Sequence, residues 1–319
     1  MIYLLYALVA LIVVFLSVKA AKYVDLLDKT TNLSGAFIGG ILLSAVTSLP
    51  ELLTSISATV WLDNPGLSIG NILGSNLFNL ATLSMLILIF IKTFKKSKIS
   101  NSHYMTAIFS LLIYMVIILN MTNILNVDFL TINVTSIIIL ILYILGVRTM
   151  ASDNSAVETL EKEINSEKVD LTLKQIIIRF ILASVGLVVF SILITYITDI
   201  ISARLNLGSG FAGALFLGIA TSLPEVTSSI SLVKMNSFNI AVGNIVGSNL
   251  FNFLILTIAD LLYIKGTIYT FADSQTVNLL ILGTAATPLM LLSLRAKNKG
   301  TTILYSLGVV VCYLLFLIL

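Results

Sequence analysis

Charged side chains are scarce in this sequence. Asp, Glu, Lys and Arg together make up 10% of its 319 residues, whereas a soluble domain carries about 25%. Hydrophobic residues account for 58%, above the roughly 45–50% of soluble domains. These proportions exclude an ordinary soluble protein and indicate an integral membrane protein, with the lipid bilayer as its main partner. We predict no nucleic-acid partner, and no obligatory protein partner is evident.

Cysteine and histidine occur once each, as Cys312 and His103. A single cysteine excludes a disulfide within the chain and a thiol-based metal site. His103 lies beside a lysine-rich loop, where we expect solvent around its ring. No histidine is therefore available at mid-membrane to activate a serine, so we do not expect an enzyme. No cofactor is predicted either.

About ten apolar segments divide the chain, each near the roughly 20 residues that cross a bilayer. They run over about 2–18, 34–60, 66–91, 104–120, 129–147, 175–197, 208–233, 238–264, 275–294 and 302–319. We predict an all-α integral membrane protein with about ten transmembrane helices. A polar stretch at 148–174 separates two halves, 1–147 and 175–319. It lacks the ligand pattern and mid-loop glycine of an EF-hand, so we interpret it as a cytoplasmic linker rather than a regulatory calcium site.

Basic residues fall almost entirely on one side of the predicted spans. Of the 18 Lys and Arg residues, only Arg204 and Lys265 lie in loops on the other side. The positive-inside rule makes the basic side cytoplasmic and places both termini outside the cytoplasm. The alternation also supports the number of spans, because one missed span would scramble it. We expect the plasma membrane as the location.

The two halves contain the same pair of motifs. Residues 47–57 read TSLPELLTSIS and residues 221–231 read TSLPEVTSSIS, identical at eight of eleven positions. Residues 70–80 read GNILGSNLFNL and residues 243–253 read GNIVGSNLFNF, identical at nine of eleven. The offsets nearly agree, so the chain contains a duplicated unit. Five spans separate equivalent helices, and this odd number inverts one repeat relative to the other, which is typical of transporters.

Only two carboxylates lie well inside apolar segments, Glu51 and Glu225, and each follows a proline. A charged side chain at mid-membrane costs at least ~2.5 kcal/mol, so such residues are normally functional. Each proline also frees a backbone carbonyl four residues earlier, and within a bilayer that oxygen needs water, a cavity or an ion as partner. The structural alternative is a pair of protonated carboxyls that hold helices together.

Further polar residues share helix faces with the two glutamates. Thr47 lies i,i+4 from Glu51, and Asn71, Ser75 and Asn79 form an i,i+4,i+8 stripe on the next span. The second repeat carries Thr221, Asn244, Ser248 and Asn252 in the same pattern. Hydrogen bonding between helices is the alternative role, above all for Asn71 and Asn244. A site of carboxylate, hydroxyl and amide oxygens suits a hard cation such as Ca²⁺. Two buried carboxylates without a cation are costly, which favours exchange of cations over uniport.

The paired motifs TSLPE and GN-x-x-GSN-x-x-N resemble the repeats of the sodium/calcium exchanger family, within the cation/calcium antiporter superfamily. The resemblance implies Ca²⁺/Na⁺ exchange by alternating access, used for Ca²⁺ efflux, with the first and sixth spans sliding against the rest. It also implies a central site with backbone oxygens near Ser44 and Gly218. The implied side-chain ligands are Thr47, Ser48, Glu51, Ser75, Asn79, Thr221, Ser222, Glu225, Ser248 and Asn252.

This sequence departs from the family pattern at two kinds of position. Val46 and Ala220 stand where the family usually has glycine, and Asn252 stands where many sodium/calcium exchangers have aspartate. The site then carries two negative charges, which two Na⁺ or two H⁺ would balance against one Ca²⁺. We therefore expect electroneutral exchange. An H⁺/Ca²⁺ antiporter or a broader divalent cation/proton exchanger is the nearest alternative, and a channel, which needs a continuous pore, is a further one.

Five aspartates fall on the side with few basic residues. They are Asp63, Asp128, Asp199, Asp260 and Asp273. Their field could concentrate cations at an outer entrance, although ordinary loop acidity explains them equally well.

Overall fold

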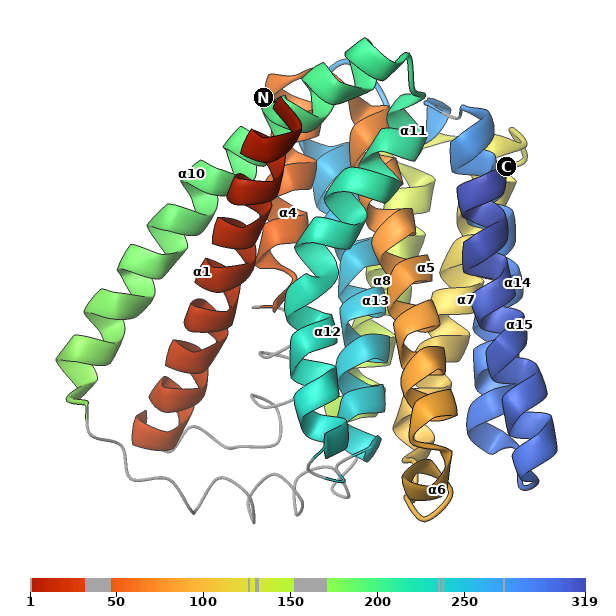
Figure 1. The fold of residues 1–319 in the computed structure, drawn as a ribbon. Helices are drawn as coiled ribbons and strands as arrows, with labels where there is room; N and C mark the ends of the chain where they lie inside the picture. Colours follow the sequence, from red (N-terminus) through yellow and green to blue (C-terminus); the bar gives the residue numbers. More distant parts are fainter. Residues whose placement is uncertain are drawn as a thin grey trace.

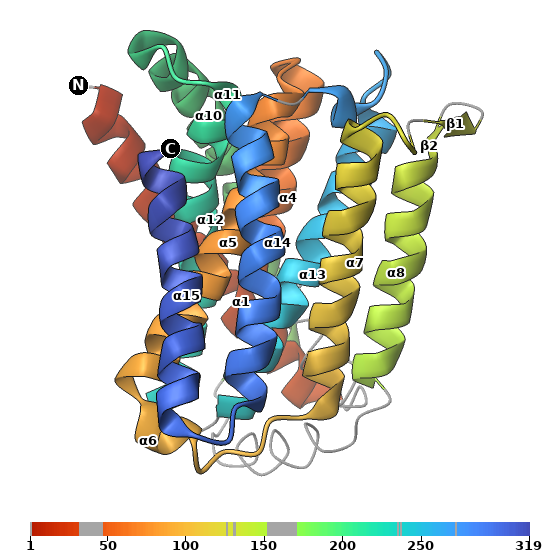
Figure 2. The same cartoon turned by 90° about the vertical axis from the view of Figure 1, so that its right-hand side faces the viewer.

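The structure is a computed structural model that describes residues 2–31, 47–125, 127–129, 132–151, 171–234, 236, 238–271 and 273–319. Long helices lie side by side, and both termini lie at the same end of the molecule (Figures 1 and 2). The first half contains α1 (Ile2–Thr31), α4 (Leu49–Ile56), the π-helix η2 (Ser57–Trp61), α5 (Pro65–Ile89), α6 (Ile91–Phe94), α7 (Asn101–Met121) and α8 (Val134–Ala151). The second half contains α10 (Leu173–Leu205), α11 (Ser209–Ala212), the π-helix η3 (Gly213–Gly218), α12 (Ile219–Lys234), α13 (Phe238–Leu262), the 3₁₀-helix η4 (Ile268–Thr270), α14 (Ser274–Arg295) and α15 (Lys299–Ile318). Two short antiparallel strands, β1 (Asp128–Phe129) and β2 (Ile132–Asn133), pair Asp128 with Asn133 before α8 begins.

The predicted membrane fold is confirmed. Within the described residues, eight helices are long and apolar enough to cross a membrane. The helix α8 is a shorter apolar helix, and the predicted span 34–60 is described only from Thr47 onward, as α4 and η2. The predicted linker 148–174 lies mostly outside the described residues, so the division at those boundaries stays a prediction.

The two repeats pack on each other by an approximate two-fold relation. The helix α1 packs against α12 as α10 packs against α4, and α15 packs against α5 as α8 packs against α13. In Figure 1, α1 runs away from the end that holds the termini, whereas α10 runs back toward it. The equivalent helices of the two halves are therefore antiparallel, as the odd number of intervening spans requires.

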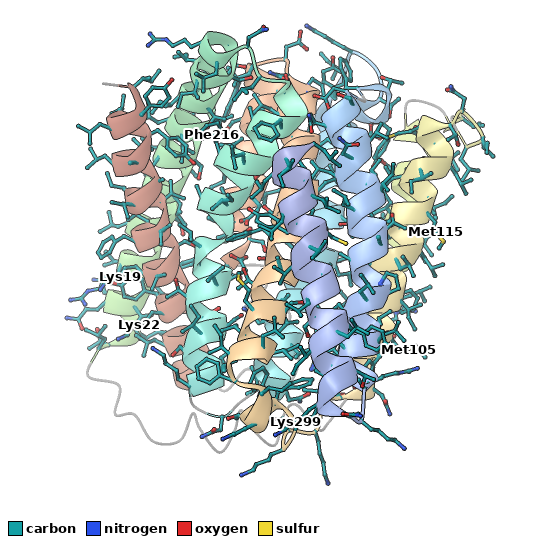
Figure 3. The ribbon with its side chains drawn as sticks, turned by 45° about the vertical axis from the view of Figure 1, so that its right-hand side comes forward. Lys19, Lys22, Met105, Met115, Phe216 and Lys299 are labelled. Carbon is teal, nitrogen blue, oxygen red and sulfur yellow. The ribbon has the colours of Figure 1, made fainter. Side chains whose placement is uncertain are left out.

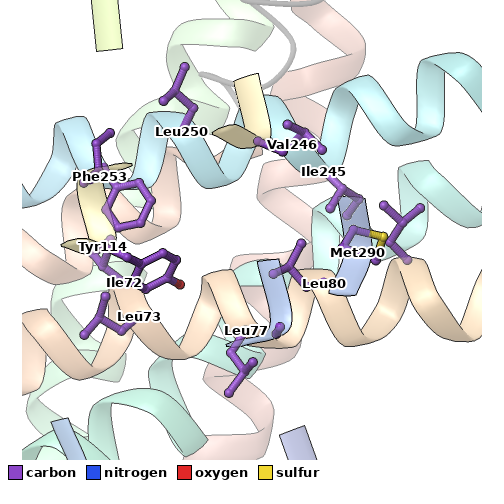
Figure 4. Close-up of a cluster of buried hydrophobic side chains, with 14 of the residues drawn as sticks. Ile72, Leu73, Leu77, Leu80, Tyr114, Ile245, Val246, Leu250, Phe253 and Met290 are labelled. Atoms are coloured by element: carbon purple, nitrogen blue, oxygen red, sulfur yellow. The ribbon is translucent and has the colours of Figure 1, made fainter. Parts of the chain in front are cut away.

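The helices α5 and α13 form the centre of the bundle. Ile72, Leu73 and Leu77 of α5 and Leu250 of α13 belong to one buried apolar cluster (Figure 4). The ring of Phe253 stacks edge-on against Tyr114 of α7, with centroids 5.0 Å apart. By contrast, α1 and α10 expose many large apolar side chains on their outer faces, as expected for helices that face lipid. This arrangement keeps the middle of α5 and α13 out of contact with lipid.

Glycine permits the closest helix contact. A Cβ added at Gly70 would lie 2.2 Å from the carbonyl oxygen of Gly210, and one added at Gly74 would lie 2.4 Å from Ala214. The backbones of α5 and of the α11–η3 segment therefore touch directly. Small residues allow such contacts between transmembrane helices. Gly70 and Gly74 therefore have a packing role at this contact.

The expected solvation of His103 needs correction. His103 is 4% exposed in the first turn of α7, against Gly243 of α13, rather than solvated. Position 243 has no side chain, and the His103 ring fills the space that a side chain there would occupy. Lys19, Lys22 and Lys299, by contrast, lie in the half of the molecule away from the termini, as predicted (Figure 3).

The predicted outer aspartates are mostly engaged in local hydrogen bonds. Asp260 is 6% exposed and accepts bonds from the hydroxyls of Ser136 (2.6 Å) and Thr267 (2.8 Å) and from the Ile268 N–H (2.9 Å). Asp273 caps α14 and also accepts from the Gly210 N–H. At the surface, Lys265 donates a hydrogen bond to Asp63 over 2.6 Å and lowers the pKa of that carboxyl. These contacts favour a structural role for the three over a field that gathers cations.

Candidate cation site

The two glutamates lie where their helices depart from regular geometry. The helix α4 begins at Leu49 and carries Pro50 in its first turn, where a missing N–H removes no helical hydrogen bond. In the second repeat Pro224 lies inside α12, and the π-helix η3 precedes it. Short π-helical segments occur often at functional sites.

Each glutamate is bonded to a serine of the opposite repeat. Ser48 Oγ donates to Glu225 Oε1, and Ser222 Oγ donates to Glu51 Oε1, both over 2.9 Å. Ser48 is the N-cap residue of α4, yet its hydroxyl makes no cap hydrogen bond within that helix. The sequence motif therefore supplies a carboxylate to one half of the site and a donor to the other half. The two repeats meet at these two reciprocal bonds.

Asn71 and Asn244 join the helices that carry the glutamates to the neighbouring helices. The Asn71 amide donates to Thr54 Oγ1 and Ser55 Oγ, both at 2.9 Å, and to the Glu51 carbonyl at 3.3 Å. In the second repeat, Asn244 donates in the same way to Ser228 Oγ, Ser229 Oγ and the carbonyl of Glu225. These bonds join α4 to α5 and α12 to α13. The alternative reading of the two asparagines as contacts between helices agrees with this geometry.

The serines of the GSN motif differ between the repeats. Ser75 Oγ donates to the carbonyl of Gly218 over 3.2 Å, so that carbonyl lies beside α5. Ser248 Oγ lies near the Glu225 carboxylate but makes no hydrogen bond of normal geometry with any residue that the structure describes. The equivalent of Gly218 in the first repeat is Ser44, which lies outside the described residues, as does Val46.

The amides of Asn79 and Asn252 are held by two asparagines that sequence reasoning missed. Asn79 Nδ2 donates to Asn249 Oδ1 over 3.0 Å, and Asn252 Nδ2 donates to Asn76 Oδ1 over 2.9 Å. Asn76 and Asn249 follow the serines of the GSN motif directly. Both copies of the motif contain these asparagines, and this repetition was the signal that could have identified them. They were missed because the predicted i,i+4,i+8 stripe does not include their positions.

The ten residues predicted to bind the cation all lie in the buried centre, and each is at most 1% exposed. Thr47, Ser48 and Glu51 lie at the start of α4, Ser75 and Asn79 on α5, Thr221, Ser222 and Glu225 on α12, and Ser248 and Asn252 on α13. The structure thus brings four helices from both repeats to one region. Whether each residue binds an ion stays a prediction.

Five buried oxygens of the ten predicted ligands have no hydrogen-bond partner within the described part of the chain. They are Glu51 Oε2, Glu225 Oε2, Asn79 Oδ1, Asn252 Oδ1 and Ser248 Oγ. Buried polar atoms normally find a partner. Among the described residues, neither glutamate pairs with a basic side chain, and no cluster of three or more His, Cys, Asp or Glu occurs. The arrangement offers oxygen ligands only, which suits a hard cation and not a soft metal.

The chain matches the family described as sodium/calcium exchanger protein over residues 2–150 and 175–319. It belongs to this family. Over 219 residues this exchanger-family chain is 26% identical to an uncharacterized membrane protein of Methanocaldococcus jannaschii, covering 69% of the chain and 68% of the relative.

Two solved structures share the fold of this exchanger-family protein. The H⁺/Ca²⁺ exchanger CAX superposes with a TM-score of 0.71 at 13% identity, over 99% of this chain and 87% of that one. The sodium-calcium exchanger NCX_Mj superposes with a TM-score of 0.60 at 20% identity, over 100% of this chain and 99% of that one. Both proton-coupled and sodium-coupled exchangers therefore have this architecture, and the fold does not distinguish between the two counter-ions.

Proposed function

We propose that this protein is an antiporter that exchanges Ca²⁺ for Na⁺ across the plasma membrane by alternating access. The observation that carries the proposal is the pair of buried glutamates, each bonded to a serine of the opposite repeat and each with one oxygen that has no hydrogen-bond partner among the described residues. Ca²⁺ takes six to eight oxygen ligands, some of them carboxylates. The ten buried residues above are the proposed ligands, with the Gly218 carbonyl beside them.

The charge of the site supports exchange rather than one-way passage. Glu51 and Glu225 are fully buried and have no basic partner among the described residues. Emptying such a site leaves two like charges in a medium of low dielectric, which is strongly unfavourable. A departing Ca²⁺ must therefore be replaced by other cations. Two Na⁺ balance the two carboxylates, and two H⁺ do so equally well, so H⁺/Ca²⁺ antiport, or a broader divalent cation/proton exchange, is the second candidate.

Alternating access would move α1 and α10 against the rest of the bundle. These two helices pack on each other, and most of their buried apolar residues belong to a second cluster, which includes Leu67 of α5 but is otherwise distinct from the cluster around α5 and α13. Toward the end that holds the termini, Tyr6 of α1 donates to the Phe216 carbonyl of η3 over 2.5 Å. Asn64 at the start of α5 donates to Asp199 of α10 over 3.0 Å. Movement of the pair would break these two contacts.

The direction of transport follows from orientation and gradients. The excess of basic residues on one side favours a cytoplasmic location for that side and an external location for both termini. The inward gradients of Na⁺ and H⁺ that cells usually maintain would drive Ca²⁺ outward. Its transported partners are then inorganic cations, and the protein is a transporter rather than an enzyme.

The direct test is ⁴⁵Ca²⁺ uptake into proteoliposomes loaded with Na⁺ and diluted into Na⁺-free buffer, with a pH gradient in place of the Na⁺ gradient as the parallel condition. Glu51→Gln removes one proposed ligand, and Asp63→Asn, which neutralises an exposed carboxylate, is the matched control. Uptake that needs internal Na⁺, vanishes in Glu51→Gln and persists in Asp63→Asn supports the proposal. Uptake driven by the pH gradient alone would move the protein to the proton-coupled class, and uptake that survives Glu51→Gln would disprove the site.

A further inference from the structure

Four asparagines form a closed hydrogen-bond pattern between α5 and α13. Asn76 Nδ2 donates to the backbone carbonyl of Asn249 over 3.3 Å, and Asn249 Nδ2 donates to the backbone carbonyl of Asn76 over 3.0 Å. The side-chain oxygens of the same two residues accept from Asn252 and Asn79. All four are at most 5% exposed. We call Asn76 and Asn249 the amide brace.

The brace leaves no freedom in the direction of these amides. The oxygen and nitrogen of an asparagine side chain are usually assigned from their neighbours, because they look alike. A backbone carbonyl, however, only accepts hydrogen bonds. Asn76 and Asn249 must therefore turn Nδ2 toward the opposite backbone and keep Oδ1 for the next residue. That residue must donate, so Asn252 and Asn79 present Nδ2 to the brace and turn Oδ1 away from it.

The two amide oxygens that point away from the brace belong to the buried oxygens without a partner among the described residues. Asn79 Oδ1 and Asn252 Oδ1 are both buried and lack a hydrogen-bond partner among the described residues. A buried amide oxygen without a partner is unfavourable, because it has lost its hydrogen bonds to water and gained none in return. The brace therefore holds two acceptors in an unfavourable state, which a bound cation would relieve.

We propose that Asn76 and Asn249 are positioning residues that aim the amide oxygens of Asn252 and Asn79 at the transported cation. Each acts across the repeat boundary, so Asn76 on α5 orients Asn252 on α13, and Asn249 orients Asn79. This inference rests on the proposed cation exchange. An ionised aspartate at either of the two oriented positions would face an amide oxygen without a proton between them. The brace is therefore compatible with the neutral amides Asn79 and Asn252 that this chain has at the two positions.

A purely structural role makes a different prediction. If the asparagines only join α5 to α13, their removal lowers stability and the amount of folded protein but leaves the cation KM of the remaining protein unchanged. Outer-shell partners of metal ligands typically contribute 10–100-fold to affinity. We therefore expect Asn76→Ala to raise the Ca²⁺ KM about 10-fold, with a smaller change in the maximal rate.

Double-mutant cycles test the crossed pairing. The KM for Na⁺-driven ⁴⁵Ca²⁺ uptake is measured for the three single alanine variants at Asn76, Asn79 and Asn252, and for two double variants. Asn76→Ala should add less than about twofold when Asn252 is already alanine, because its target is gone. It should retain most of its effect when Asn79, three residues away on the same helix, is alanine. The mirrored cycle pairs Asn249 with Asn79 and uses Asn252 as the control.

Three outcomes would decide against the inference. Effects of Asn76→Ala that multiply fully with those of Asn252→Ala, coupling to Asn79 instead, or an unchanged KM would each overturn it. Asn76→Leu, which fills a similar volume without an acceptor, replaces the alanine variant if the latter does not fold. A wild type that moves another cation but no Ca²⁺ disproves the proposed substrate alone, and the cycle is then read on the KM of that cation. A wild type that moves no cation overturns both proposals.

Discussion

Transport by this protein is expected to be insensitive to membrane voltage. The site holds two carboxylates, the side chains at 79 and 252 are neutral amides, and neither glutamate has a basic partner among the described residues. One Ca²⁺ or two monovalent cations then neutralise it, and no net charge crosses in a full cycle. If three Na⁺ exchanged for each Ca²⁺, one charge would cross. One charge moving through about 100 mV is worth ~2.3 kcal/mol, which is about a 50-fold change in an equilibrium ratio.

The assay measures the final ratio of internal to external ⁴⁵Ca²⁺ in proteoliposomes with a fixed gradient of whichever counter-ion, Na⁺ or H⁺, drives uptake. Valinomycin and graded K⁺ concentrations set the voltage between zero and about 100 mV. We expect the ratio to change by less than about twofold over this range, and Glu51→Gln to show no accumulation at any voltage. A change near 50-fold would refute the charge count, and with it the view that two carboxylates alone balance the cargo. The test does not depend on whether Na⁺ or H⁺ is the counter-ion, because two of either carry the same charge.

Other substitutions test separate parts of the structure. Ser48→Ala and Ser222→Ala should each raise the Ca²⁺ KM about 10-fold and to a similar extent. Each substitution removes one hydrogen bond to a carboxylate, which is worth ~1.5–3 kcal/mol. An effect of only one of the two substitutions would contradict the two-fold relation. Gly70→Ala should lower the free energy of unfolding by about 1–3 kcal/mol through overpacking, which a lower melting temperature in detergent would reveal. Gly300 has room for a methyl group, so Gly300→Ala should leave the melting temperature unchanged. Asp260→Asn should reduce thermal stability by about 1–3 kcal/mol and leave the Ca²⁺ KM at low salt unaltered; a salt-dependent KM change would revive the cation-gathering role.

The fold could be predicted from sequence because a bilayer restricts the choices. Apolar segments of sufficient length must be helices, and the alternation of basic loops fixed their number. The duplicated motifs then gave the inversion, and the buried Glu51 and Glu225 gave the centre of the site. Each of these signals is local in the chain or repeats at a nearly constant offset.

The features that could not be predicted from the sequence depend on contacts between the two repeats. Nothing in the spacing of Asn76 tells that its amide points at the backbone of Asn249, because that bond joins residues 173 positions apart. The burial of His103 likewise depends on the absence of a side chain at Gly243 on another helix. Asp260 lies at a helix end, where a solvated carboxylate is the ordinary expectation. Its three donors come together only in the fold, Ser136 from α8 of the other repeat and Thr267 and Ile268 from the segment after α13.

The exchange of serine donors between the repeats has a consequence for the origin of the chain. Ser48 serves Glu225 and Ser222 serves Glu51, so a single five-helix unit holds a carboxylate without its donor and a donor without its carboxylate. An ancestral protein of one unit could complete both pairs only by associating with a second copy inserted upside down in the same membrane. Fusion of two such copies would fix their opposite orientations and free each half to diverge.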